Sequence, residues 1–129
     1  ITAFCLTLIQ IFSGTQVRQF IDLQMNQYPN QYELWLEFAP IKFYFHRSFS
    51  ILIFLINLFL FLKFKKINSI PFSLKIIISL IGLEIITGAI MYYFDFPVTS
   101  QPIHLFLATL IFSAQLYLIF QFTLINKNQ

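Results

Sequence analysis

The 129-residue sequence has few charged residues, few glycines and a single cysteine. Charged residues make up 10% of the chain and hydrophobic residues 58%, whereas a typical soluble domain is about 25% charged. The mean hydropathy is +0.77. These values exclude a soluble globular domain and indicate an integral membrane protein. Because Cys5 is the only cysteine, the chain can form no internal disulfide.

The charge balance and the aromatic residues exclude little more. The formal net charge of +3 is too small and too dispersed to predict a nucleic-acid partner, so the expected surroundings are membrane lipid. The 18 phenylalanines suit a lipid-facing surface as well as a packed interior, and they indicate no cofactor. The sequence has no initiator methionine and opens inside an apolar run at Ile1, so we expect a fragment of a longer protein.

Four apolar runs predict an all-α integral membrane protein, a single domain built as a four-transmembrane-helix bundle. A helix needs about 20 apolar residues, or somewhat fewer, to cross the bilayer core. The runs cover residues 1–17, 41–62, 71–94 and 102–125. Residues 19–39 mix polar and apolar side chains, and we expect one or two short interfacial amphipathic helices there, broken at Tyr28-Pro29.

Lysines predict the orientation of the spans. Residues 63–70 contain three lysines, and short cytoplasmic loops carry the excess of lysine and arginine. This loop is therefore predicted to be cytoplasmic, and residues 18–39 and 95–101 to lie outside. The second and fourth spans then both run from outside to inside.

Two histidines stand near the outer ends of these parallel spans. His46 and His104 each lie within about 10 Å of the end, at ~1.5 Å per residue. Ionisable groups at membrane depth are rare and mark candidate functional sites. Each histidine is followed, at steps of four, three and four residues, by a small residue, a branched aliphatic residue and an amide: Ser50, Ile53 and Asn57 after His46, and Ala108, Ile111 and Gln115 after His104.

This repeated pattern predicts a haem site. The spacing keeps each set on one helical face, where Ser50 and Ala108 leave room for a flat macrocycle. Neutral imidazole is a common axial ligand of haem iron. Either histidine alone would be interpreted as a packing residue, but the matched pair favours His46 and His104 as the two ligands of one haem iron.

Three more residues have two interpretations each. Arg47 and Arg18 lie at the outer interface, where a guanidinium can pair with a haem propionate or simply anchor the helix. Glu84 stands alone in the middle of the third span, and burial should keep it largely protonated. It is either a proton relay or polar contact at the haem edge, or a structural acid bonded to an amide or a carbonyl.

Four motifs, in order along essentially the whole chain, resemble the second (C-terminal) half of haem A synthase. They are Gly-Thr-Gln-Val-Arg at 14–18, Phe-His-Arg-Ser at 45–48, Gly-Leu-Glu-Ile-Ile-Thr-Gly at 82–88 and Gln-Pro-Ile-His-Leu at 101–105. The resemblance implies half of a pseudo-symmetric eight-helix enzyme that oxidises the C8 methyl group of haem O to the formyl group of haem A for terminal oxidases.

The resemblance also implies a division of labour. In that family each half carries a histidine pair; the second half is held to bind haem b as cofactor and the first half to receive haem O. Carried over, His46 and His104 are the iron ligands and this half relays electrons. The first half has a glutamate three residues before its His-Arg pair, and here that position is Phe43. Catalytic residues are therefore expected in the absent half, and the fragment alone is expected to be inactive.

The implied setting is the bacterial cytoplasmic membrane, with the haem site toward the outer face. The missing N-terminal half is an implied partner, and haem O synthase and oxidase assembly factors are candidate partners. Two other classes stay open on the sequence. One is a b-type cytochrome that passes electrons through the same bis-histidine haem without oxygenase chemistry. The other is a structural membrane subunit in which both histidines are packing residues.

Overall fold

Four long helices and one short helix form the described part of the chain. A computed structural model describes residues 1–29, 31–37, 39–66 and 71–127, without the side chains of 125–127. The elements are α1 (Thr2–Gln27), the short 3-10 helix η1 (Tyr32–Trp35), α2 (Ile41–Lys66), α3 (Phe72–Tyr93) and α4 (Ser100–Lys127). No strand occurs among these residues, which confirms the predicted all-α class.

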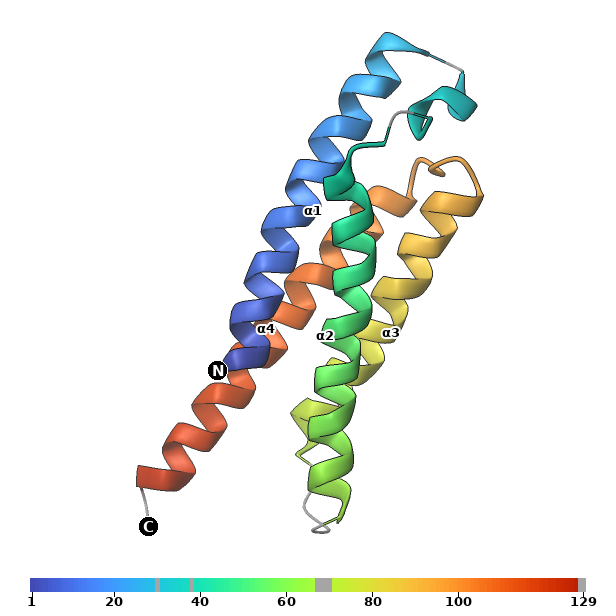
Figure 1. Cartoon of the computed structure of the whole chain (residues 1–129). Coiled ribbons are helices and arrows are strands. Elements are labelled where there is room, and N and C mark those ends of the chain that lie inside the picture. The colour runs from blue at the N-terminus through green and yellow to red at the C-terminus, as the bar shows by residue number, and fades with distance from the viewer. Residues whose placement is uncertain (30, 38, 67–70, 128–129) are drawn as a thin grey trace.

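The helices pack as an antiparallel bundle in which each helix contacts two others (Figure 1). α1 and α3 each pack against both α2 and α4. Within the described residues, α2 and α4 make no close backbone contact with each other, so they stand diagonally across the bundle. Both descend from the end that carries η1 (Figure 1). The diagonal pair of parallel helices is the pair that carries the two histidines.

Three of the helices are long and apolar enough to cross a membrane. They are Ile41–Lys66, Phe72–Tyr93 and the Ser100–Leu124 part of α4. α1 is long enough but is not among them, because Gln10, Ser13 and residues 15–16 interrupt its apolar run. The predicted first span at 1–17 is therefore helical, although its composition is less apolar than that of the other three.

The end of α1 differs from the prediction. The short helix expected just after residue 19 is not separate, because α1 continues to Gln27. No proline or glycine interrupts residues 19–27, and Arg18 pairs with Asp22 one turn on, at 3.5 Å. The break itself falls where it was predicted, since Pro29 disfavours helical backbone at Tyr28. α2 and α4 likewise extend past their predicted ends, to Lys66 and Lys127.

Trp35 closes the end of the bundle beside α1. Its side chain is 4% exposed, and its indole N–H donates to the carbonyl of Tyr28 at 3.0 Å. The ring packs edge-on against Tyr32 and lies 6.2 Å from the ring of Phe96, which follows α3. This contact ties the α1–α2 connection to the α3–α4 connection.

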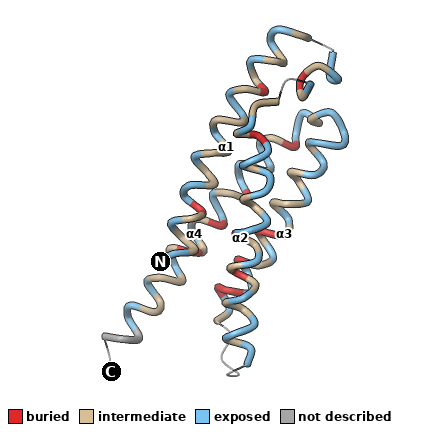
Figure 2. The backbone as a smooth tube through the Cα atoms, in the orientation of Figure 1, coloured by how far each residue is buried: buried red, intermediate tan, exposed pale blue. Residues whose placement is uncertain are grey.

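The core lies between α2, α3 and α4, and large hydrophobic side chains cover the outside. Ile53, Ile77, Ile81 and Ile111 form the buried cluster. Figure 2 shows that buried residues are few and that the outward faces are largely exposed. A bundle that faces lipid requires an apolar outer surface. Its backbone polar groups are hydrogen-bonded within the helices.

The lysine placement predicts that the two ends of the bundle label from opposite sides of the membrane. Val98 is 94% exposed in the α3–α4 connection, and Lys66 ends α2 on an exposed position. In a Cys5→Ala background, a membrane-impermeant maleimide applied from outside should label Val98→Cys in intact cells and should label Lys66→Cys only after permeabilisation. Equal labelling of both in intact cells would show the orientation to be wrong.

Candidate functional site

A cavity of about 590 Å³ lies between the four helices. Its volume falls within the range of roughly 300–1,000 Å³ typical of small-molecule and cofactor sites. The walls are mostly apolar, and a few polar side chains from all four helices converge on it. Those side chains include Gln10 and Arg18 of α1, His46 and Arg47 of α2, Glu84 of α3 and His104 of α4.

His46 enters the cavity from the second turn of α2 and packs on α1. An ideal Cβ at Gly14 would lie 2.9 Å from its Cε1 atom, closer than real contacts allow, so the ring fits only against glycine. Gln10, one turn earlier on α1, donates its amide N–H to the main-chain carbonyl of His46 at 3.0 Å. The ring nitrogen Nδ1 is buried and has no hydrogen-bond partner among the described residues.

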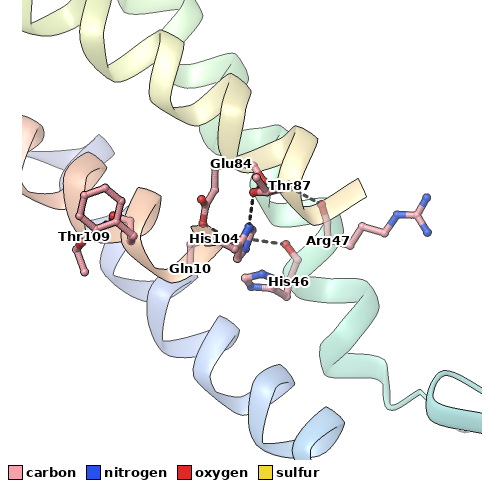
Figure 3. Close-up of polar contacts among 9 residues, drawn as sticks. Gln10, His46, Arg47, Glu84, Thr87, His104 and Thr109 are labelled. Atoms are coloured by element: carbon pink, nitrogen blue, oxygen red, sulfur yellow. Dashed lines mark hydrogen bonds and ion pairs between the residues drawn. The ribbon is translucent and has the colours of Figure 1, made fainter. Parts of the chain in front are cut away.

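His104 enters from the second turn of α4 and is held by α3. Its Nδ1 lies 2.9 Å from the hydroxyl oxygen of Thr87, and its Nε2 lies 3.2 Å from Oε1 of Glu84. A Cβ at Gly88 would meet its Cε1 at 3.5 Å, an ordinary contact. Figure 3 shows the imidazoles of His46 and His104 directed into the same space between the helices. The structure thus brings the two predicted residues to one site.

Unpartnered polar atoms gather around this space. Besides Nδ1 of His46, Oε1 of Gln10 and Oε2 of Glu84 are buried and make no hydrogen bond within the described part of the chain, and the two other such atoms are the side-chain nitrogen and oxygen of Gln115, outside the cavity. A buried polar atom without a partner costs about 1–3 kcal/mol, and such atoms are rare. Three such atoms belong to side chains that line this one cavity. They are suited to a ligand that offers polar groups or a metal ion.

The predicted arginines lie on the cavity wall. Arg47 places its guanidinium carbon 4.5 Å from the ring centroid of Tyr92, a cation–π contact. Arg18 pairs with Asp22 while about half of each side chain is exposed, so that ion pair is weak. Both arginines are exposed residues on the cavity wall, the Arg47 side chain extends away from the two histidines (Figure 3), and neither has a buried ion partner among the described residues.

The predicted small residues also line the cavity, whereas the predicted amides do not. Ser50 and Ala108 are on its wall, and the Ser50 hydroxyl donates back to the carbonyl of Arg47 at 2.7 Å. Asn57 and Gln115 are buried below it; Asn57 donates to the carbonyl of Ile53 at 2.8 Å. Phe43 is a buried wall residue whose ring stacks on Tyr92.

Sequence reasoning missed Gln10 and Thr87. The signal for Thr87 was its place three residues after Glu84, which puts both on one face of α3. The signal for Gln10 was a lone amide four residues before Gly14 in an apolar run. Neither spacing identifies the histidine that each residue contacts, because those contacts depend on how the helices pack.

The chain belongs to the family of cytochrome oxidase assembly proteins, COX15-CtaA, whose model matches residues 1–116. This is the haem A synthase family, which confirms the resemblance drawn from the four sequence motifs. Membership implies an enzyme of haem A biosynthesis. Comparisons with curated proteins and with solved structures give no match.

The two glycines predict opposite effects of the same substitution. Gly14→Ala forces the His46 ring to move, which costs about 1–3 kcal/mol as overpacking does, and the helix preference of alanine, about 1 kcal/mol, offsets only part of that cost. Gly88→Ala meets no clash and should be neutral or stabilising, since alanine favours helix by about 1 kcal/mol. Thermal unfolding in detergent, followed by circular dichroism, makes the comparison. Equal effects of the two variants would contradict the close packing of His46 on α1.

Proposed function

We propose that this chain is the cofactor-binding half of a haem A synthase, and that it holds one haem b between His46 and His104. One observation carries the proposal: two histidines on diagonally opposed, parallel helices direct their rings into one cavity near the same end of the bundle. Two imidazoles placed in this way could hold one haem iron between them.

The residues of the cavity fit the group. Among the described residues no three histidine, cysteine or acidic side chains could together hold a metal ion, whereas haem iron needs only two protein ligands because the macrocycle supplies four. Gly14 lets the His46 ring pack directly on α1. Ser50 and Ala108 add little bulk one turn on from each histidine. The cavity volume and the mostly apolar walls suit a flat, largely apolar ligand.

Arg47 and Arg18 are the proposed partners of the haem propionates. Both line the cavity, and neither is committed to a buried carboxylate within the described chain. Bidentate pairing between a guanidinium and a carboxylate is strong where water is scarce. Arg47 would keep its contact with the ring of Tyr92, and Arg18 would give up its exposed contact with Asp22.

Glu84 is proposed as a polar contact at the haem and as the group that shields His104 before haem enters. Its carboxyl now contacts Nε2 of His104, the atom that would ligate iron. A neutral acid donating its O–H to a neutral imidazole avoids burying two charges in an apolar bundle. The carboxyl has to release Nε2 when iron binds, and its second oxygen is free of other partners in the described structure.

The arrangement favours electron transfer over oxygen activation in this half. Haem b, when bound, supplies a one-electron carrier. With His46 and His104 both holding its iron, that haem would serve electron transfer rather than oxygen binding, and the wall position of Phe43 is apolar, so it cannot move a proton. We infer that oxidation of haem O takes place in the other half of the enzyme, with the present half passing electrons to it from the outer side of a bacterial cytoplasmic membrane.

The same bis-histidine geometry would also serve a b-type cytochrome without oxygenase activity. Membership of the haem A synthase family favours the first candidate. The missing half and haem O are then the direct partners, with haem O synthase and oxidase assembly factors as further candidates.

Loss of either ligand should change the haem spectrum. The protein purified with haem b should show a low-spin spectrum, and His46→Ala and His104→Ala should each lose haem or convert it to a high-spin form. Gln115→Leu is the matched control, because Gln115 is buried on the same face of α4 but lies below the cavity. Unchanged Soret and α bands in both alanine variants would refute the assignment.

The proposed division of labour predicts that this chain binds haem b without converting haem O. The chain should be incubated with haem O, oxygen and a reductant, and the pigments separated by chromatography. We expect unaltered haem O, while membranes containing the longer protein should yield haem A. Hydroxylated or formyl product from this chain alone would place catalysis in the present half.

A further inference from the structure

The hydroxyl of Thr87 contacts both a main-chain carbonyl and the ring of His104. It donates to the main-chain carbonyl of Glu84 at 3.0 Å, and the same oxygen lies 2.9 Å from Nδ1 of His104. A hydroxyl has one proton to donate. With that proton on the carbonyl, the hydroxyl accepts from Nδ1, which is the arrangement in which Nδ1 carries the ring hydrogen; a hydrogen on Nε2 would instead make the hydroxyl the donor to Nδ1.

A hydrogen on Nδ1 leaves the lone pair on Nε2, the nitrogen that now faces Oε1 of Glu84 at 3.2 Å. The two ring nitrogens are distinct, and the hydrogen bond made by one decides which of them can act as a ligand. The ring is held from two sides by α3, since Thr87 contacts Nδ1 at 2.9 Å and Glu84 contacts Nε2 at 3.2 Å. Figure 3 shows Thr87 beside His104, on the side away from His46.

His46 has no equivalent partner. Its Nδ1 is buried and unbonded within the described part of the chain, and its ring is placed by close packing against Gly14, where a Cβ would come within 2.9 Å. One histidine is therefore held by a hydrogen bond and the other by shape alone.

We propose that Thr87 is a positioning residue for the haem site: its hydroxyl accepts the Nδ1 hydrogen of His104 and presents Nε2 to the iron. The inference rests on the proposed function, and it adds that His46 and His104 have unequal roles at the haem. A ligand histidine that donates its second N–H becomes more basic, which favours the oxidised iron. Thr87 thus lowers the reduction potential of the haem through His104, and no residue described here does the same through His46.

The test compares three variants of the protein purified in detergent and loaded with haem b. Thr87→Val removes the hydroxyl and keeps the shape, and Thr87→Ser restores the hydroxyl. Thr109→Val is the matched control, because Thr109 makes the same kind of main-chain bond, to Phe106 at 2.7 Å, but is exposed and points away from the histidines (Figure 3). Haem affinity is measured by titration, the midpoint potential by redox titration, and helix content by circular dichroism.

We expect Thr87→Val to bind haem b about 10- to 100-fold more weakly, as loss of such a supporting hydrogen bond does, and to shift the midpoint potential upward. Thr87→Ser and Thr109→Val should match the wild type in both quantities. A Thr87→Val protein with wild-type affinity and potential would overturn the inference. So would a Thr87→Ser protein as impaired as Thr87→Val, because shape would then matter and the hydroxyl would not. Failure of the wild type itself to bind haem b would instead refute the proposed function.

Discussion

The structure depends on the cost of keeping polar side chains inside an apolar bundle. A buried polar atom without a hydrogen bond costs about 1–3 kcal/mol, and the described helices place two half-buried histidines, a glutamate and a glutamine around one cavity. Thr87 meets part of this cost at His104, and Glu84 meets another part at the opposite nitrogen. The remainder, at His46 Nδ1, Gln10 and the second oxygen of Glu84, is unmet by the described residues. Polar atoms left without partners on the cavity wall indicate that the cavity receives a ligand.

The order and direction of the helices bring these polar side chains together at one site. Because consecutive helices are antiparallel, α2 and α4 run the same way, and their second turns lie at the same end of the bundle. Because they are diagonal, the space between them is bounded by α1 and α3, which supply glycine at the points where the rings approach. Each histidine is therefore supported by an adjacent helix, His46 by α1 and His104 by α3, and the two histidines face each other across the cavity. Membership of the haem A synthase family agrees with the proposal that this cavity binds haem.

Much of the fold could be predicted from the sequence, because apolar runs of this length leave few alternatives to membrane helices. The all-α class and the helix break at Tyr28-Pro29 followed from hydropathy and from proline. The full length of α1 did not, since composition marks where a helix leaves the apolar layer and not where its backbone stops. The two histidines and Glu84 were identified because ionisable groups are rare in such runs, and the structure brings all three to one cavity. Thr87 and Gln10 were missed because a threonine or an amide in a membrane helix usually bonds its own backbone. Only the packing of α3 on α4, and of α1 on α2, shows that these two face histidines.

The central claim is that His46 and His104 ligate the same iron. Electron paramagnetic resonance of the oxidised, haem-loaded protein, combined with nitrogen hyperfine spectroscopy after incorporation of ¹⁵N-labelled histidine, tests it directly, since the chain has only two histidines. The account predicts one low-spin iron coupled to two labelled imidazole nitrogens. A high-spin iron, or coupling to a single imidazole, would contradict it.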